Sequence, residues 1–119
     1  MNILLCGGAG YIASHTIIEL DKAGHSVVVV DNFVNSQPEA IHRVEKLIGK
    51  QIKYYDADVR DEKAMTTVFQ ENKIDAVIHF AGLKAVGESV AKPLEYYHNN
   101  MTGTFILMDV MRNNGCKNI

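Results

Sequence analysis

The sequence has few of the features that mark secreted or membrane-bound proteins. Cysteine is scarce: only Cys6 and Cys116 occur among 119 residues, with no C-x-x-C pair and no histidine at metal-ligand spacing. We therefore expect no metal site, and both thiols buried as small apolar groups in a reducing compartment. No apolar run approaches the roughly 20 residues needed to cross a bilayer, and no basic segment precedes the first apolar residues. These absences predict a cytoplasmic protein with no membrane partner.

Positive charge is not in excess either. Twelve Lys and Arg residues stand against fourteen Asp and Glu residues, which gives a formal net charge of −2. A surface that binds a polyanion needs a basic excess, so we expect no nucleic-acid partner. With 47% hydrophobic and 22% charged residues, the composition is that of an ordinary globular domain. A chain of this length can form a core without disulfides or a metal.

Short apolar segments alternate with segments of helical periodicity along the chain. The predicted strands cover residues 3–6, 27–30, 52–55 and 76–80, and the predicted helices cover residues 11–24, 36–48, 62–72 and 93–114. Alternation of this kind favours βαβ units and a parallel sheet. The sequence ends at residues 116–119, where the alternation requires another strand. We therefore expect residues 1–119 to be the N-terminal part of a longer domain, cut after about four strands.

Individual residues mark the ends of these helices. Gly24 is a natural left-handed cap for the first helix. Ser36 followed by Pro38 and Glu39 is typical of a capping box that opens the second helix. Gly103 interrupts the fourth helix at a cost of about 1 kcal/mol relative to alanine, so we expect a close-packing reason for it. The apolar positions along the four helices are Ala13, Ile17 and Leu20; Ile41, Val44 and Ile48; Met65, Val68 and Phe69; and Tyr97, Met101, Phe105, Met108 and Met111.

A glycine-rich turn follows the first predicted strand directly. The run Gly7-Gly8-Ala9-Gly10-Tyr11-Ile12-Ala13 satisfies both G-x-x-G-x-x-A and G-x-G-x-x-A. Glycines there let the backbone approach a pyrophosphate, whose charge is met by the N–H groups at the start of the following helix. Glycines also serve ordinary turns, but here the strand before, the helix after and an acidic residue downstream fit together. The pattern is typical of a Rossmann-type doubly wound parallel α/β sheet, for which we expect the strand order 3-2-1-4.

The acidic residue is Asp31, which ends the second predicted strand. A carboxylate there accepts hydrogen bonds from both ribose hydroxyls of an adenosine and repels a 2′-phosphate. No lysine or arginine follows in Asn32, Phe33 or Val34, so we expect NAD rather than NADP. The alternative is a solvated turn residue. Ser36 in the next loop lies either over the adenosine or at the cap of the second helix, and we favour the cap.

Two further segments end at the same edge of the predicted sheet. Asp58 follows the third strand, where it would face the adenine; equally, Asp58 and Asp61 are acidic residues that the dipole of the third helix favours. Ala81 and Gly82 follow the fourth strand and are small enough for a cofactor to lie against their backbone. Lys84 either reaches a phosphate or is an ordinary exposed lysine.

Four segments of the sequence resemble one enzyme family in particular. They are residues 7–15, 31–36, 79–90 and 92–100, of which residues 79–90 are the most specific. They are similar to the N-terminal part of the UDP-glucose 4-epimerases, a family of extended short-chain dehydrogenases/reductases, and the resemblance covers essentially the whole chain. Cys6, Ala13 and His98 depart from the commonest pattern of the family without removing a ligand.

The resemblance implies a set of contacts with NAD. By position, it places Gly7, Gly10, Tyr11 and Ile12 at the pyrophosphate, Asp31, Asn32, Asn35 and Ser36 around the adenosine ribose, Asp58 and Val59 at the adenine, Phe80, Ala81, Gly82 and Lys84 along the cofactor, and Asn99 near the nicotinamide-side ribose. It also implies a homodimer that pairs through the helix predicted at residues 93–114. The alternative is that the apolar residues of this helix all face the sheet.

The residues that perform the family's reaction are not among these 119. In the family, a Tyr-x-x-x-Lys pair removes a sugar hydroxyl proton while hydride passes to NAD, and a transient 4-keto sugar takes the hydride back on its other face. None of the five tyrosines is followed by lysine four positions later, so we expect no catalytic residue here and no activity from the chain alone. The resemblance thus implies the NAD-binding part of an enzyme of galactose metabolism that interconverts UDP-glucose and UDP-galactose.

Two alternatives share the glycine turn and Asp31. One is a nucleotide-sugar dehydratase or decarboxylase of the same family, which is not expected to carry residues 79–90 in this form. The other is a non-catalytic dinucleotide sensor built on the same fold. A Tyr-x-x-x-Lys motif beyond Ile119 would indicate an enzyme, and its absence would indicate a sensor.

Overall fold

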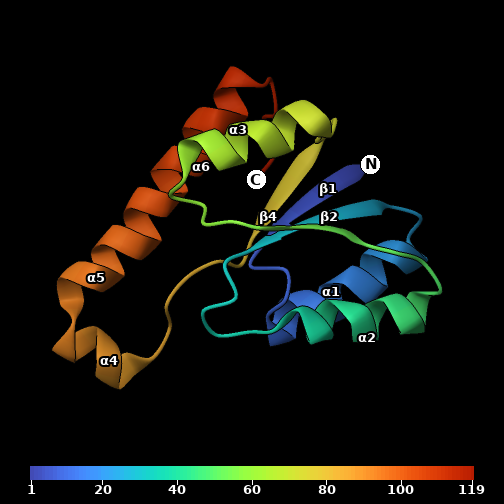
Figure 1. The fold of residues 1–119 in the computed structure, drawn as a ribbon. Helices are drawn as coiled ribbons and strands as arrows, with labels where there is room; N and C mark the ends of the chain where they lie inside the picture. Colours follow the sequence, from blue (N-terminus) through green and yellow to red (C-terminus); the bar gives the residue numbers. More distant parts are fainter.

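The computed structural model describes all 119 residues as a parallel sheet with helices on both faces (Figure 1). The elements in chain order are β1 (Asn2–Cys6), α1 (Tyr11–Lys22), β2 (Ser26–Asp31), α2 (Pro38–Ile48), β3 (Lys53–Asp56), α3 (Glu62–Glu71), β4 (Ala76–His79), α4 (Val86–Ala91), α5 (Pro93–Tyr97), a π-helical turn (His98–Thr102) and α6 (Gly103–Asn113). The strand order is β3-β2-β1-β4, and every pair is parallel. The predicted Rossmann-type sheet and its strand order are confirmed.

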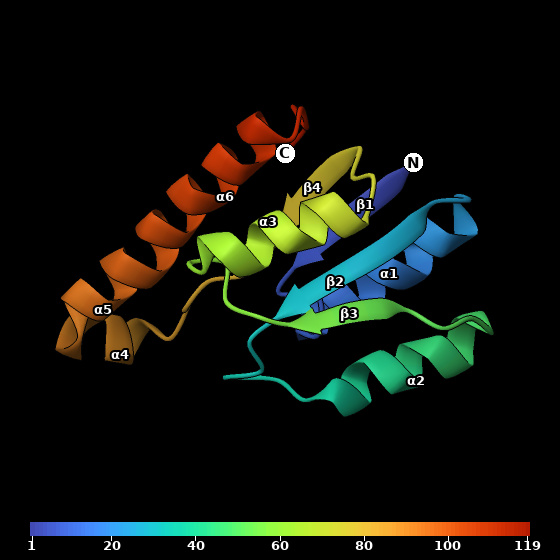
Figure 2. The same ribbon diagram turned by 45° about the horizontal axis from the view of Figure 1, so that its top comes forward.

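Alternate residues of the central strands point into two separate cores. Leu4 and Cys6 of β1 pack with α3 and α6, whereas Ile3 and Leu5 pack with α1 and α2. Figures 1 and 2 show these two helix layers on opposite faces of the sheet. Both faces of the central strands are therefore covered, which explains their nearly continuous apolar sequence. Of the predicted inner positions of the first three helices, Ala13, Ile17, Ile41, Val44, Met65, Val68 and Phe69 are buried, whereas Leu20 and Ile48 are only partly buried.

The fourth predicted helix differs from the structure in its geometry. Residues 93–113 are helical throughout, but the turn His98–Thr102 is a π-helix between α5 and α6. An additional, unpredicted helix α4 precedes α5 and has no buried residue. Together α5, the π-turn and α6 form one long rod, which runs diagonally across Figure 1.

The apolar residues of this rod lie on two different faces. The face packed on the sheet consists of Gly103, Leu107, Val110 and Met111. Tyr97, Met101, Phe105 and Met108 form a second stripe, which we call the outer stripe, with exposed fractions between 49% and 62%. The alternative that all the apolar residues face the sheet is therefore wrong, because one helix cannot turn both faces toward the same layer.

The predicted cap of α2 is also wrong. The helix begins at Pro38, and the residue before it, Gln37, makes no side-chain capping bond. Ser36 lies one residue too early, and its hydroxyl donates instead to Oδ1 of Asp31 at 3.1 Å. Because proline has no N–H and tolerates the first helical position, the helix begins there without a side-chain cap.

Gly103 has the close-packing reason that its position predicts. A Cβ on this residue would lie 2.8 Å from Cγ2 of Val59 and 3.5 Å from Cγ of Arg60. The start of α6 is thereby able to touch the loop after β3.

The last residues of the chain lie along the outer edge of β4. The Val77 N–H donates to the carbonyl of Asn118 at 2.9 Å, and the Asn118 side-chain amide donates to the carbonyl of Asp75 at 3.2 Å. Residues 116–119 thus return to the sheet, where a fifth strand was expected. No helix has both the length and the apolarity that crossing a bilayer requires.

Candidate functional site

A cavity of about 460 Å³ opens at the carboxyl ends of the four strands. Its walls are the glycine turn after β1, the loops after β2, β3 and β4, and residues of α5 and the π-turn. Strand order reverses beside β1, and ligands of doubly wound sheets bind at this kind of crevice. The site therefore lies where the sheet topology predicts it.

The glycine turn is packed too tightly against its neighbours for side chains. Gly7 has a φ of +79°, and a Cβ on it would lie 2.7 Å from the Ala81 nitrogen. A Cβ on Gly8 would lie 2.6 Å from Cγ1 of Val29. Helix α1 then begins after Gly10, which provides no side-chain cap. The N–H groups of the first turn of α1 are therefore available to an anion.

Asp31 joins the glycine turn to the loop after β2. The residue is only 9% exposed. Its Oδ2 accepts a hydrogen bond from the Ala9 N–H at 3.0 Å, and its Oδ1 accepts from the Phe33 N–H at 2.8 Å and from the Ser36 hydroxyl. The alternative of a solvated turn residue is therefore wrong. Of the roughly four acceptor positions of a carboxylate, one on Oδ2 is left for a ligand.

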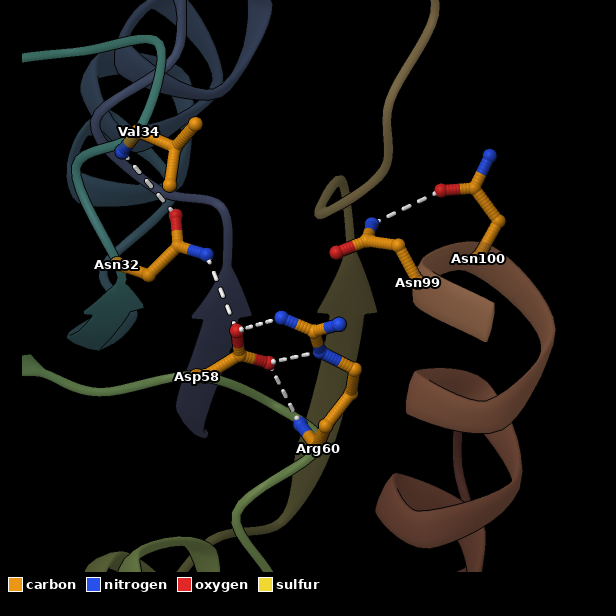
Figure 3. A network of polar contacts seen from close by, with 6 residues as sticks. All are labelled: Asn32, Val34, Asp58, Arg60, Asn99 and Asn100. Carbon is orange, nitrogen blue, oxygen red and sulfur yellow. Dashed lines mark hydrogen bonds and ion pairs between the residues drawn. The ribbon is translucent and has the colours of Figure 1, made fainter. Parts of the chain in front are cut away.

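Asp58 lies at the centre of a hydrogen-bond network between the loops after β2 and β3 (Figure 3). Its Oδ1 accepts from the Arg60 N–H at 2.9 Å and from Nε at 3.0 Å, and its Oδ2 accepts from Nη2 at 2.7 Å and from Nδ2 of Asn32 at 3.3 Å. Hydrogen bonds from the Arg60 guanidinium lower the pKa of Asp58 from 3.8 to about 2. Asp61, not Asp58, caps α3, where it accepts from the Ala64 N–H at 3.1 Å.

Asn100 holds the loop after β4 on the long rod. Its Oδ1 accepts from the Leu83 N–H at 2.8 Å, and its Nδ2 donates to the Leu83 carbonyl at 2.9 Å. Asn99 donates to the same Oδ1 at 3.0 Å, as Figure 3 shows, and lines the cavity. Both asparagines belong to the π-turn, a geometry that occurs often at functional sites. The turn thus serves the cavity and the adjoining loop with two consecutive residues.

His79 ends β4 but is not part of the cavity. Its Nε2 lies 3.0 Å from the Thr104 hydroxyl, and its Nδ1 is buried without a hydrogen-bond partner. Burial lowers the pKa of His79 below 6.5, and the nearby charge of Lys84 lowers it further. His79 contacts Thr104 and does not line the cavity.

The structure brings most of the predicted site residues together around this one cavity. Thirteen of the fifteen line it: Gly7, Gly10, Asp31, Asn32, Asn35, Ser36, Asp58, Val59, Phe80, Ala81, Gly82, Lys84 and Asn99. Tyr11 and Ile12 do not line it; they lie at the start of α1 and are 81% and 62% exposed. Only their backbone N–H groups are placed toward the anion position described above.

Seven lining residues were not predicted: Val30, Val34, Ala57, Arg60, Leu83, Glu95 and His98. Arg60 carried a signal, because it follows Asp58 by two positions in the loop after β3. Glu95 and His98 carried none, since only the path of α5 and the π-turn brings them to the strand ends.

The cavity combines groups whose chemistry suits the parts of a dinucleotide. It offers free N–H groups at a helix start, acceptors on Asp31 and Asp58, the cation of Lys84 and the amide of Asn99. No cluster of three His, Cys, Asp or Glu side chains is arranged to hold a metal ion. A parallel sheet of this order, with a glycine turn before α1 and an acid at the end of β2, defines a dinucleotide-binding protein of the Rossmann type.

Comparison with known proteins narrows this class. The sequence profile of the NAD dependent epimerase/dehydratase family matches residues 3–119. The chain therefore belongs to the NAD dependent epimerase/dehydratase family. It is 59% identical over its whole length to the UDP-glucose 4-epimerase of Bacillus subtilis (strain 168), and 50% identical, over 98% of the chain, to that of Mus musculus. The chain spans about a third of these relatives, 35% of each.

Solved structures agree with this assignment. The UDP-glucose 4-epimerase from Bifidobacterium longum, in complex with NAD+ and UDP, superposes with a TM-score of 0.96 at 58% identity, covering 98% of this chain and 35% of that one. The enzyme from Stenotrophomonas maltophila, with bound NAD and formylated UDP-arabinopyranose, superposes with a TM-score of 0.95 at 44% identity, with the same coverage.

Proposed function

We propose that this chain binds NAD and forms the cofactor-binding part of a UDP-glucose 4-epimerase. The observation that carries the proposal is the single cavity in which the glycine turn, Asp31 and Asp58 meet at the strand ends. The residues fit the cofactor, since the turn that would receive the pyrophosphate has no room for a side chain at Gly7. The complexes of NAD with the similar enzymes from Bifidobacterium longum and Stenotrophomonas maltophila support the choice of cofactor.

Each part of the cavity has a role in this proposal. The first N–H groups of α1 bind the pyrophosphate, and the remaining acceptor position of Asp31 binds the adenosine ribose. Asp58 and Val59 bind the adenine. Phe80, Ala81, Gly82 and Lys84 lie along the cofactor, and Asn99 faces the nicotinamide-side ribose. Asn35 and Ser36 close the adenosine side.

The chain's own residues then bind and orient rather than transfer protons. NAD, when bound, supplies the hydride acceptor and donor for the sugar carbon that is inverted. The glycine turn and the two hydrogen bonds between Asn100 and the Leu83 backbone keep the loops around the cofactor in one conformation. Because no Tyr-x-x-x-Lys pair occurs here, we place proton transfer and UDP-sugar binding outside residues 1–119, which form the N-terminal part of an NAD-binding Rossmann domain.

The outer stripe supports a proposal about assembly. Tyr97, Met101, Phe105 and Met108 place large apolar side chains in solvent along one face of the rod. Contiguous apolar surface of this kind marks an interaction site, and we propose that a second copy of the protein covers it.

Two buried, unpaired cysteines support a reducing compartment and hence a cytoplasmic location.

The proposal predicts a preference for NAD over NADP that depends on Asp31. A 2′-phosphate would meet the Asp31 carboxylate, so titration of the isotope-labelled chain followed by NMR should show tighter binding of NAD. Asp31→Ala should reduce the ratio of the two affinities by roughly tenfold, the effect of one charged contact. The ratio is the proper readout, because this variant also leaves the Ala9 N–H without its partner.

Asp56→Ala is the matched control, since Asp56 pairs with Asp31 in the sheet register but is exposed and outside the cavity. Its ratio should equal that of the unchanged chain. Equal affinities for NAD and NADP in the unchanged chain would contradict the role of Asp31, and no binding of either would contradict NAD binding itself.

A further inference from the structure

We propose that Arg60 is a positioning residue for nucleobase recognition: it fixes the Asp58 carboxylate so that one acceptor position of Oδ2 faces the exocyclic amino group of a bound adenine. The proposal rests on the NAD binding proposed above. Arg60 touches no predicted ligand atom in this scheme and acts through Asp58 alone.

Asp58 uses its four acceptor positions unequally. Arg60 occupies three of them, two on Oδ1 through its backbone N–H and Nε, and one on Oδ2 through Nη2 at 2.7 Å. The fourth, on Oδ2, is met only by the Asn32 amide at 3.3 Å, the longest of the four contacts. A contact of that length is weak and is readily replaced by a better donor. The carboxylate is thus locked on one side and exchangeable on the other.

The Arg60 guanidinium is held in place by the chain itself, without a ligand. The pair forms two parallel N–H···O bonds, a geometry that fixes both orientation and distance. The stem of Arg60 lies beside the start of α6, since its Cγ is 3.5 Å, an ordinary contact distance, from where a Cβ of Gly103 would stand. Preorganisation of this kind raises affinity because less motion is lost on binding.

The charge of Arg60 is balanced within the loop after β3. Arg60 brings a cation to the cavity, but its bonds to Asp58 neutralise the pair locally. The other basic residue of the cavity, Lys84, belongs to the loop after β4 rather than to the loop after β3. The guanidinium is therefore committed to the carboxylate, which explains how an arginine can line the cavity of a protein expected to prefer NAD.

The competing explanation is that this local pair only shapes the turn before α3. The two explanations differ in what a substitution does to base selectivity. We therefore compare NAD with nicotinamide hypoxanthine dinucleotide, in which a carbonyl oxygen replaces the adenine amino group and would face the carboxylate. Binding to the isotope-labelled chain is measured by NMR titration, and the same spectra show whether each variant is folded.

The unchanged chain should prefer NAD over the hypoxanthine analogue by about tenfold or more, the effect of one hydrogen bond to a charged acceptor. Asp58→Ala should remove most of this preference. Arg60→Met, which keeps the stem but loses the guanidinium, should reduce the preference at least threefold. The double variant should match Asp58→Ala, because Arg60 acts through Asp58. Arg60→Lys keeps the charge without the fork and should also lose selectivity, which provides a second variant if Arg60→Met unfolds.

Arg43→Met is the matched control, because Arg43 makes an exposed ion pair with Glu39 on α2, away from the cavity. Its selectivity should be unchanged. The proposal is overturned if Arg60→Met and Arg60→Lys weaken both dinucleotides by the same factor. It is also overturned, while NAD binding stands, if the unchanged chain binds both dinucleotides equally. Failure to bind either one would overturn NAD binding and this inference together.

Discussion

Two carboxylates at neighbouring strand ends show how a residue becomes part of a site. Asp31 and Asp58 both keep most of their acceptor positions filled by donors of the chain itself. A carboxylate held in this way has a fixed direction, and its last free or weakly used position becomes specific. We expect the protein to lose stability when such a carboxylate is protonated or its partner is removed.

Asp58 therefore predicts a pH-dependent contribution to stability. Because Arg60 lowers the pKa of Asp58 from 3.8 to about 2, the stabilisation is complete above pH 4 and is lost as the pH falls toward 2. Allowing for solvent screening at a partly exposed pair, Arg60→Met should cost about 1–2 kcal/mol at pH 7. Urea unfolding of both chains at pH 7, 4, 3 and 2 should show this difference shrinking.

The other titratable groups of the cavity, Asp31, Lys84, Glu95 and His98, are common to both chains and largely cancel in the difference. Arg43→Met should show no such trend, because its partner Glu39 is exposed. A difference between the unchanged chain and Arg60→Met that stays constant from pH 7 to pH 2 would refute the ion-pair explanation.

At the scale of the element, the long rod presents three different sets of residues along its length. Its inner face packs on the sheet through Leu107, Val110 and Met111. The π-turn presents Asn99 to the cavity and Asn100 to the loop after β4. The outer stripe faces solvent. Gly103 lies at the junction between the π-turn and the inner face of α6.

Two glycines in helices provide a matched pair for testing this close approach. A Cβ on Gly103 would lie 2.8 Å from Cγ2 of the buried Val59, whereas a Cβ on Gly87 of α4 would meet nothing within 4 Å. Gly103→Ala should lower the free energy of unfolding by about 1–2 kcal/mol, because overpacking outweighs the gain in helix propensity. Gly87→Ala should raise it by about 0.5–1 kcal/mol. Urea unfolding measures both, and a Gly103→Ala chain as stable as the original would argue against the contact.

The outer stripe predicts association that a single charge disrupts. Met108 is 50% exposed on α6, so Met108→Glu should place a charge in the proposed interface without disturbing the core. Sedimentation should show the unchanged chain as a dimer and the variant as a monomer with the same circular dichroism spectrum. Gln70→Glu, on an exposed position of α3, adds the same charge elsewhere and should leave the dimer intact. A dimer that survives Met108→Glu would count against this face.

At the scale of the whole molecule, most of the predicted site residues meet in one cavity at the carboxyl edge of the sheet. His79, at the end of β4, is half-buried, contacts the Thr104 hydroxyl and does not line the cavity. No tyrosine has a lysine four positions later. Positioned acid–base groups raise the rate of reactions that require proton transfer by a factor on the order of 10²–10⁴.

We therefore expect the 119-residue chain to show no epimerase activity. Incubation with UDP-glucose and NAD should yield no UDP-galactose above the background without protein, measured by chromatography of the sugar nucleotides. The UDP-glucose 4-epimerase of Bacillus subtilis, which is 59% identical over this region, is the positive control. Turnover by the chain, with contaminating enzyme excluded by mass spectrometry, would show that the reacting groups lie within it.

Local patterns along the sequence were sufficient for much of this description. The alternation of apolar segments predicted the four strands, and the Rossmann-type pattern of the glycine turn predicted their order. Gly7 and Asp31 were found because a dinucleotide site needs each of them directly after a strand, whereas Asp58 was assigned to the site only by the resemblance to the UDP-glucose 4-epimerases. These features depend on neighbours in sequence, which a pattern records.

Features that join distant segments were decided only by the tertiary structure. Ser36 matched a local capping pattern, yet its hydroxyl bonds Asp31 because the loop after β2 folds back on its own strand. The π-turn, the two faces of the rod and the place of Arg60 beside Gly103 likewise depend on how the long rod crosses the loops after β3 and β4. The sequence by itself determined the sheet and the strand-end residues, since periodicity and turn chemistry are local. Which acceptor positions stay open, and which apolar face stays exposed, was settled only by packing between segments far apart in the chain.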